Sequence, residues 1–420
     1  MKKIIILAIV LQAVSVSMFG QTNTNKVYWV HGLGDRATVW NTYRNALIPR
    51  ENRGASIQWY MSYPLQYSAD TLNTIINSEV PSSKKAIVFG HSAGGLVARQ
   101  AARKPGNRIR AIITAGTPNN GAGIVTSINN RSFNNVARKA IGKVQASLSL
   151  GAQAIGTLLP GVGNAIAALI SGGTVLIGEV GKGLADNAIE DVKNAYNSEA
   201  AVCDMDPNNS SFLRSLNSST TSIPIINIYG NEDDNRLVRI AGTAMHKADN
   251  DSPSNTTDQC YDQTAFPYYN GAIATCTTFE VIHASVGATA AVVGIFCPSL
   301  WAASAMNLSA AVSWADTRRF IQYDVHNEWD RVIGATHVDR IENWRRFLWV
   351  KWCDVESVTV YENSDGFIPN KSSIMSGSNI KNIEIKGVNH LEMNSHLNMR
   401  NTLISIYSGG YGPSFNPKDN

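Results

Sequence analysis

Residues 86–102 decide the fold, and they read AIVFGHSAGGLVARQAA. The β-rich run before Gly90 predicts a buried strand, and the run from Gly94 onward predicts a helix. Ser92 lies between them in the pattern Gly-x-Ser-x-Gly, at a strand-to-helix turn too tight for a Cβ at neighbouring positions. Such a turn lifts the serine oxygen out of the backbone, where a carbonyl carbon can reach it. The stretch therefore predicts a nucleophilic serine.

Other β-rich runs recur along the chain and alternate with segments of helical periodicity. This alternation predicts an α/β fold, in which helices cover both faces of a mainly parallel central sheet. Buried parallel strands should be continuously apolar, and several of the runs largely are. The expected strands are residues 26–30, 56–60, 85–89, 109–114, 223–229, 357–361 and 382–386.

Two long stretches interrupt this alternation. Residues 121–198 are rich in Gly, Ala, Ile and Leu, whereas residues 231–354 begin polar and become strongly apolar between Ala284 and Val312. We expect both to be insertions over the sheet, the second forming a cap or extra subdomain. Pro298 breaks the most apolar run, which argues against a membrane span there.

The composition sets broad limits on the class of protein. With 420 residues, 44% of them hydrophobic and 16% charged, the chain has the composition of an ordinary globular protein. Single α/β domains with insertions reach this length, so the length does not require several domains. The formal net charge of +4 is small, and no long run has one charge sign. We therefore expect no nucleic-acid partner.

The N-terminal segment has the pattern of a secretion signal. Lys2 and Lys3 precede an apolar stretch at residues 4–10, and small residues follow it. We expect a signal peptide over residues 1–20, a single domain over residues 21–420, and a secreted or periplasmic protein. Disulfides can form in exported proteins. Cys260 and Cys276 are the first pair to test, although spacing alone does not determine the pairing.

A serine hydroxyl is a poor nucleophile at neutral pH, so a histidine must take its proton and a carboxylate must orient that histidine. With a nucleophile in this type of turn, the three residues follow in the order serine, acid, histidine. We favour His390 because its loop comes directly after the last expected strand. His396 is expected at the start of the final helix, where a structural role is the better interpretation.

Two acidic segments are candidates for the carboxylate. One is Ser364-Asp365-Gly366, which follows a short expected strand and places Asp365 25 residues before His390. The other is Asn231-Glu232-Asp233-Asp234, which follows the expected strand at residues 223–229. Asp and Gly are also ordinary turn residues, so position alone leaves this choice open.

The first expected strand ends in His31-Gly32-Leu33-Gly34-Asp35. Attack on a carbonyl produces a negative oxygen that needs two aligned N–H donors, and backbone amides provide them without reorganisation. One donor is expected from this glycine-rich loop and the other from the residue after the nucleophile. Leu33 and Ala93 are therefore the candidates for an oxyanion hole.

These segments resemble the α/β-hydrolase superfamily, in particular bacterial lipases and the lipases that are similar to glycosylphosphatidylinositol inositol-deacylases. In such lipases the Asp-Gly motif after an insertion supplies the acid, so the resemblance favours Asp365. It also implies a helical lid after the Gly-Thr-Pro segment, able to make transient contact with a lipid surface. The matching segments are residues 31–34, 90–96, 115–118 with 121, 204–207, 211–213, 216–217, 364–366 and 389–392.

Several such lipases carry an aspartate on a structural calcium at the position where this chain has Glu392. The resemblance therefore makes Glu392 a calcium candidate, and no other cofactor is expected. No Cys-x-x-Cys motif or His cluster with metal spacing is present in the sequence, so a zinc site is not indicated.

We therefore expect a secreted serine hydrolase in which Ser92, His390 and Asp365 cleave a carboxylic ester through an acyl-enzyme. The apolar insertions favour a lipid or another acyl ester with a medium-to-long chain. An acyltransferase, a thioesterase or an amidase would use the same residues. A non-catalytic secreted protein that binds lipid on the same scaffold is the alternative from another class.

Overall fold

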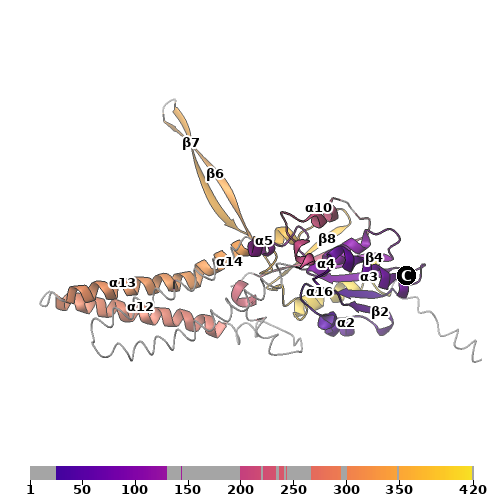
Figure 1. The fold of residues 1–420 in the computed structure, drawn as a ribbon, viewed down its shortest axis with the longest axis horizontal. Helices are drawn as coiled ribbons and strands as arrows, with labels where there is room; N and C mark the ends of the chain where they lie inside the picture. Colours follow the sequence, from indigo (N-terminus) through magenta and orange to yellow (C-terminus); the bar gives the residue numbers. More distant parts are fainter. Residues whose placement is uncertain are drawn as a thin grey trace, which may run out of the picture.

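The computed structural model describes residues 25–129, 143, 199–218, 221–232, 236–240, 243, 266–294, 300–347 and 350–418. Figure 1 shows a body built around a sheet and two arms that project from it, one a pair of long helices and the other a two-stranded ribbon. The expected signal peptide, residues 1–20, lies outside the described residues. Of the expected lid at residues 121–198, only residues 121–129 and 143 are described.

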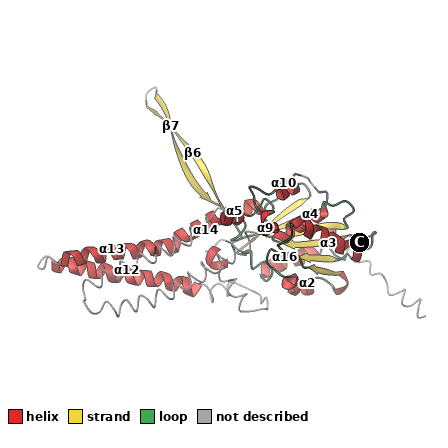
Figure 2. Ribbon diagram, in the orientation of Figure 1, coloured by secondary structure: helices red, strands yellow, loops and turns green. Residues whose placement is uncertain are grey.

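A six-stranded sheet, with every neighbouring pair parallel, forms the centre of the body (Figure 2). The chain starts inside the sheet, goes out to one edge, crosses back past its first strand and then proceeds to the other edge. This confirms the expected α/β class. The order across the sheet is β2 (Arg53–Ile57), β1 (Val27–Val30), β3 (Ala86–His91), β4 (Ile109–Ala115), β5 (Ile225–Asn231) and β8 (Ile380–Lys386).

The strands divide their side chains between two apolar cores, one on each face of the sheet. Tyr28 and Val88 enter one core, whereas their neighbours Trp29 and Phe89 enter the other. Side chains alternate between the faces because successive residues of a strand point in opposite directions. A parallel sheet buried in this way explains why its strands read as continuous apolar runs.

Helices cover both faces. The core around Tyr28 also takes apolar side chains from three helices, α3 (Leu65–Glu79), α4 (Ala93–Ala102) and α10 (Ser211–Asn217). On the other face, α2 (Asn41–Leu47) and α16 (Leu397–Tyr407) contribute to the core around Trp29. Short elements connect these layers: η1 (Ala37–Trp40), η2 (Arg50–Asn52), α5 (Gly123–Asn129), α9 (Ala200–Cys203), α15 (Asn370–Ser373) and η6 (Pro413–Phe415).

The first arm is a helical hairpin of α12 (Phe266–Gly294) and α13 (Leu300–Arg319), which lie side by side (Figure 1). His283 and Asn307 are buried and form a hydrogen bond of 3.0 Å between Nδ1 and Oδ1 across the pair. The π-helix η5 (Phe320–Asp324) and α14 (Val325–Ile333) lead back to the body. Among the described helices, none is long and apolar enough to cross a membrane.

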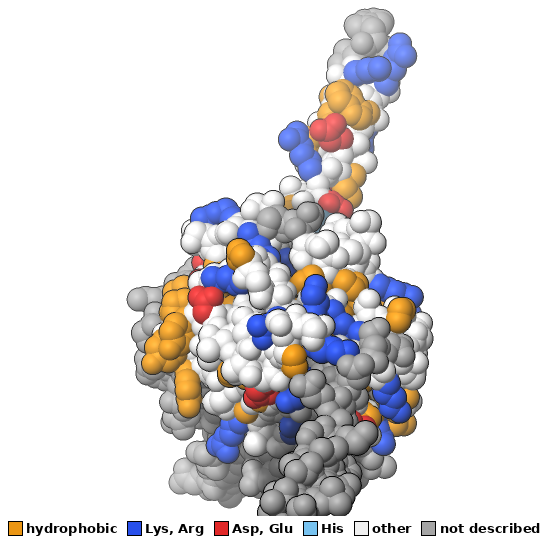
Figure 3. Space-filling view, turned by 90° about the vertical axis from the view of Figure 1, so that its right-hand side faces the viewer, with side chains coloured by type: hydrophobic (Ala, Val, Ile, Leu, Met, Phe, Trp, Pro, Cys, Tyr) orange, Lys and Arg blue, Asp and Glu red, His pale blue; other side chains and the backbone are white. Residues whose placement is uncertain are grey.

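The second arm, named the β arm here, consists of β6 (Thr336–Phe347) and β7 (Val350–Tyr361). The two strands pair antiparallel along their full length, from Thr336 opposite Tyr361 to Phe347 opposite Val350. Figure 3 shows this ribbon standing clear of the body, with cationic and apolar side chains exposed along it. Two strands without a layer against them have no core of their own.

Two strand predictions need correction. Residues 357–361 do not belong to the central sheet, because they form the end of β7 and pair with β6. A β-rich run indicates extended backbone but does not identify the strand with which it pairs. The predicted strand at residues 56–60 begins earlier, at Arg53, where the chain pairs with Val27 of β1.

The cysteine prediction is also corrected in part. Cys276 is a free, buried thiol in α12, so the pairing of Cys260 with Cys276 is not formed. Cys260 lies outside the described residues. Cys203 and Cys353 are free as well. Burial raises the pKa of the Cys276 thiol to about 11, which keeps this sulfur protonated at neutral pH.

Candidate active site

Ser92 occupies the predicted turn between β3 and α4. Its φ of 52° and ψ of −128° make it the one non-glycine residue with positive φ in the described chain. Its N–H donates to the carbonyl of Ala115 over 2.8 Å, which attaches the turn to the end of β4. Holding a serine in this conformation costs about 1–3 kcal/mol, and strain of this kind is typical of functional sites. The side chain is partly exposed, so a substrate can reach it.

The glycines of the motif are required by close backbone contacts. A Cβ on Gly90 would lie 2.4 Å from the carbonyl oxygen of Gly94, and a Cβ on Gly94 would lie 2.4 Å from that of His31. A Cβ on Gly95 would lie 1.9 Å from the Thr117 hydroxyl oxygen. The turn is therefore packed between the loops that follow β1 and β4, as the motif predicts.

Asp365 and His390 are in direct contact. Their Oδ2 and Nδ1 atoms are 2.7 Å apart, and the backbone N–H of His390 donates to the carbonyl of Asp365 over 2.8 Å. The other carboxylate oxygen, Oδ1, accepts hydrogen bonds from the N–H groups of Phe367 and Ile368 at 3.0 and 2.7 Å. With Nδ1–H donating to the carboxylate, Nε2 is left to act as a base.

The imidazole of His390 lies at the same edge of the sheet as Ser92. A Cβ on Gly116, which directly follows β4, would be 3.0 Å from His390 Nδ1. The rings of His390 and His91 are 4.9 Å apart, and His91 directly precedes Ser92. Within the described residues the Ser92 hydroxyl donates no hydrogen bond to His390. Asp365 and His390 are therefore hydrogen-bonded to each other, and Ser92 lies beside them without a hydrogen bond to His390.

The two oxyanion candidates border the same turn. A Cβ on Gly32 would lie 3.0 Å from the Cβ of Ser92, so the loop that carries Leu33 passes directly against the serine. Ala93 is the first residue of α4, and the N–H groups of a first helical turn have no acceptor within the helix. These positions are suited to bind a negative oxygen next to the serine.

Sequence reasoning missed the residues that brace this loop. Trp59 donates from Nε1 to the carbonyl of His31 over 2.9 Å, and from its backbone N–H to His31 Nε2 over 3.3 Å. His31 Nδ1 in turn lies 2.8 Å from the carbonyl of Gly32. Burial lowers the pKa of His31, which favours the neutral ring that both contacts need. The only sequence signal was a tryptophan soon after β2.

The acid loop is supported by α14, which belongs to the second predicted insertion. Trp329 donates from Nε1 to the carbonyl of Gly366 over 2.8 Å, and its ring packs edge-on against Phe367 at 5.9 Å. Phe367 in turn lies edge-on to the ring of His390, with centroids 5.6 Å apart. This insertion therefore helps to position the Asp365–His390 pair.

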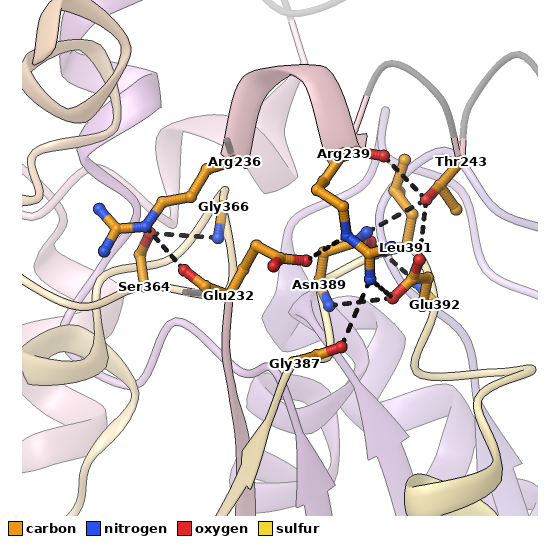
Figure 4. Close-up of polar contacts among 10 residues, drawn as sticks. All are labelled: Glu232, Arg236, Arg239, Thr243, Ser364, Gly366, Gly387, Asn389, Leu391 and Glu392. Atoms are coloured by element: carbon orange, nitrogen blue, oxygen red, sulfur yellow. Dashed lines mark hydrogen bonds and ion pairs between the residues drawn. The ribbon is translucent and has the colours of Figure 1, made fainter. Parts of the chain in front are cut away.

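Glu392 takes part in a buried ion-pair network beside the histidine loop (Figure 4). Its Oε2 is 3.0 Å from Arg239 Nη2, while Arg239 Nε is 2.8 Å from Glu232 Oε2. Thr243 donates its hydroxyl to Glu392 Oε1 over 3.3 Å, and the N–H of Asn389 donates to Oε2 over 3.4 Å. Arg239 therefore connects the end of β5 with the loop that carries His390.

This network bears on the suggested calcium site. The cation at the Glu392 carboxylate is a guanidinium, and a divalent ion at the same oxygens would be repelled by Arg239. The described residues contain no group of three or more His, Cys, Asp or Glu side chains that would hold a metal. The residues present do not fit a calcium ion. Burial raises the pKa of Glu392 to about 7 although Arg239 opposes the shift.

The alternative candidates have other positions. His396 caps α16, with its Nδ1 accepting from the N–H of Asn398 over 3.1 Å. Glu232 from the alternative acidic segment binds Arg239, and Asp233 and Asp234 lie outside the described residues.

Residues of the lipase-like segments that follow β4 contact the helices around the site. Arg99 of α4 is buried and donates to Asn119 and Asn217 at 2.9 and 2.7 Å, which connects α4 with α10. Asp204 accepts from the N–H of Leu65, at the start of α3, over 2.8 Å. These residues serve as structural links between the helices.

One protein family matches part of the chain. Residues 55–156 match the sequence model of a family described as PGAP1-like alpha/beta domain. The match runs from β2 through the Ser92 turn and past β4, which is about a quarter of the chain. No curated protein matches the chain in sequence.

Solved structures show distant similarity. The chain resembles Bacillus licheniformis lipase BlEst2 in mature form at 14% identity and a TM-score of 0.28, over 51% of this chain and 69% of that one. A Bacillus megaterium epoxide hydrolase has 15% identity and a TM-score of 0.24, over 50% and 77%. A thermophilic esterase from Thermogutta terrifontis has 19% identity and a TM-score of 0.25, over 50% and 74%.

The parallel sheet, the helices on both faces and the strand–serine–helix turn define an α/β-hydrolase fold. Together with the family match around Ser92, they place this chain in the α/β-hydrolase superfamily, as its motifs indicated.

Proposed function

We propose that this protein hydrolyses a carboxylic ester, and that Ser92, His390 and Asp365 form its catalytic triad. The observation that carries the proposal is the buried Asp365–His390 pair at the same sheet edge as the strained Ser92 turn. A carboxylate held by two backbone amides, a histidine oriented by it and an accessible serine are the groups that acyl transfer requires.

In the first half of the reaction, His390 Nε2 takes the hydroxyl proton as the Ser92 oxygen attacks the carbonyl carbon of the ester. The N–H groups of Leu33 and Ala93 stabilise the negative oxygen that forms. The tetrahedral intermediate then collapses, the bond to the leaving alcohol breaks, and Nε2 returns the proton to that alcohol. The acyl group is left on Ser92 as an ester.

In the second half, water replaces the alcohol. His390 takes a proton from the water as its oxygen attacks the acyl-enzyme, and the proton returns to Ser92 when the carboxylic acid leaves. Asp365 orients the imidazole throughout, because the N–H groups of Phe367 and Ile368 hold its carboxylate in place while Oδ2 accepts from His390 Nδ1–H.

We include a lipid or another long-chain acyl ester as the substrate. The motifs that resemble lipases support this choice, and so do the apolar side chains that the helical hairpin exposes. Val281, Val292 and Val312 are 57%, 63% and 69% exposed. Exposed apolar surface of this kind is found where proteins meet lipids or partners. Export guided by residues 1–20 remains part of the proposal, and so does lipid contact through the lid.

The test is hydrolysis of p-nitrophenyl esters with acyl chains from two to sixteen carbons. Turnover should be highest with the long chains, and Ser92→Ala should reduce kcat on the order of 10⁶-fold. Asp365→Asn should reduce it about 10⁴-fold, because the histidine loses its orientation, whereas Asp234→Asn should have little effect. Activity that survives in Ser92→Ala would refute the nucleophile. Wild type that is inactive on every ester would instead favour a lipid-binding protein.

A further inference from the structure

We propose that the free end of the β arm inserts into the surface of a phospholipid bilayer that carries anionic lipids. Residues 344–346 and 351–352, near this end of the two strands, read WRR and KW, a mixture of aromatic and cationic residues with no acid. Trp344 and Trp352 are 67% and 41% exposed, and Arg345, Arg346 and Lys351 are exposed as well. Tryptophan and cations are the side chains that favour the membrane–water interface.

The register places aromatic and cationic side chains on both faces of the ribbon. Arg346 is directly opposite Lys351, and two residues further along Trp344 is opposite Cys353, so these share one face. Arg345 is directly opposite Trp352, so this pair lies on the other face. A groove on a protein covers one face of a ribbon. A bilayer surface surrounds an inserted end on all sides. It can therefore bind the aromatic and cationic side chains on both faces of the ribbon at once.

Cations predominate at the free end of the arm. The acidic residues Asp339, Glu342, Asp354 and Glu356 lie nearer the body, and Asp354 Oδ2 is 3.0 Å from Arg345 Nε. Figure 3 shows blue side chains just below the free end, and red ones closer to the body with a further blue one between them. Arg346 and Lys351 are directly opposite each other, which concentrates positive charge at this end of the arm. Anionic headgroups are the complementary partner.

The arm is rooted beside the candidate active site. β6 starts two residues after Gly334, which ends α14, and β7 ends at Tyr361, four residues before Asp365. Lys371 donates to the carbonyl of Thr336 over 3.2 Å, which attaches the root of β6 to the body. Twelve residues per strand extend the arm by roughly 40 Å. An anchored arm would therefore tether the catalytic edge near a lipid surface, a consequence that rests on the proposed function.

The experiment measures binding of the mature chain to phosphatidylcholine vesicles with and without 30% phosphatidylglycerol, by flotation. Binding should require phosphatidylglycerol and should weaken as salt is raised. The triple variant Arg345→Gln, Arg346→Gln, Lys351→Gln should bind on the order of a hundredfold more weakly, since each cation near the surface contributes about fivefold. The double variant Trp344→Ser, Trp352→Ser should also lose most of its binding.

Two variants serve as matched controls. Arg340→Gln removes an exposed cation nearer the root of the same arm, and Trp301→Ser removes a tryptophan that is 53% exposed on α13. Both should bind as wild type does. Equal binding to both vesicle types would refute the proposal, as would unchanged binding in the triple variant. A loss in Trp301→Ser as large as in the arm variants would assign the contact to the helical hairpin and refute it too.

Two further measurements separate this proposal from the function of the site. Turnover of a short, water-soluble ester should be unchanged in the arm variants, which also shows that they fold. Ser92→Ala should bind vesicles as wild type does, because the arm does not include the nucleophile. Sedimentation at equilibrium tests a second copy of the chain as the partner. If the wild type were a dimer and the arm variants were monomers, the partner of the arm would be a second copy of the chain, and the lipid proposal would be refuted.

Discussion

Arg239 should be one of the largest single contributors to stability outside the apolar cores. Its guanidinium lies 2.8 Å from Glu232 and 3.0 Å from Glu392, and the three side chains are 3%, 3% and 0% exposed. Water does not screen charges at such positions, so Arg239→Gln leaves two buried carboxylates without their cation. Removing one member of a buried ion pair destabilises a protein by about 3–5 kcal/mol.

Glu392 limits this loss. Burial already raises its pKa to about 7, so without Arg239 this carboxyl takes up a proton near neutral pH and becomes neutral. Glu232 then remains as the uncompensated charge. The double variant Arg239→Gln, Glu392→Gln should therefore be only slightly different in stability from Arg239→Gln alone at neutral pH, while both remain well below wild type.

Unfolding in urea, followed by circular dichroism, measures these differences, with the slope compared across the variants. Arg331→Gln is the matched control, because Arg331 pairs with Glu328 at 3.1 Å but is 48% exposed. An exposed pair contributes about 0–1 kcal/mol, so the control should unfold near the wild-type midpoint. If Arg239→Gln lost no more stability than Arg331→Gln, the network would not have the structural role assigned to it.

Three other changes test separate features. Ser92→Gly should abolish turnover. It should also raise the unfolding free energy by about 1 kcal/mol, because glycine adopts positive φ without strain. A variant less stable than wild type would contradict the strain assigned to this turn. Gly94→Ala should prevent stable folding or activity, since its Cβ would lie 2.4 Å from the His31 carbonyl oxygen, whereas Gly271→Ala, in a helix with open space around it, should retain activity. An active Gly94→Ala enzyme would argue against this contact. Burial raises the pKa of Glu392 from 4.5 to about 7, so the stability that this group contributes is complete below pH 4.5 and is lost as the pH rises through 7. Glu392→Gln should flatten the pH dependence of the unfolding free energy in this range, and an unchanged pH dependence would exclude Glu392 as its source.

The nucleophile turn could be predicted from residues 86–102 because its requirements are local. A strand that enters a tight turn and a helix that leaves it need glycine at positions set by backbone sterics within a few residues of Ser92. The parallel sheet could be predicted as well, since strands buried on both faces read as apolar runs. His390 followed from its place after the last strand, and the resemblance, rather than its position, selected Asp365.

Contacts between residues that are distant in the chain could not be predicted in this way. The resemblance to lipases made Glu392 a calcium candidate, and only folding places Arg239, 153 residues earlier, at its carboxylate. Residues 357–361 were assigned to the wrong sheet because β propensity describes the backbone and not its partner. Trp59 and Trp329 brace the site through bonds to His31 and Gly366 that no local pattern encodes.

The sequence by itself therefore determined the strand–serine–helix turn at Ser92, where sterics act between neighbouring residues. The tertiary structure alone decided what surrounds that turn: which cation neutralises Glu392, which helix supports Asp365, and where the aromatic and cationic end of the β arm projects. These depend on pairing, burial and charge compensation between segments that meet only when the chain folds.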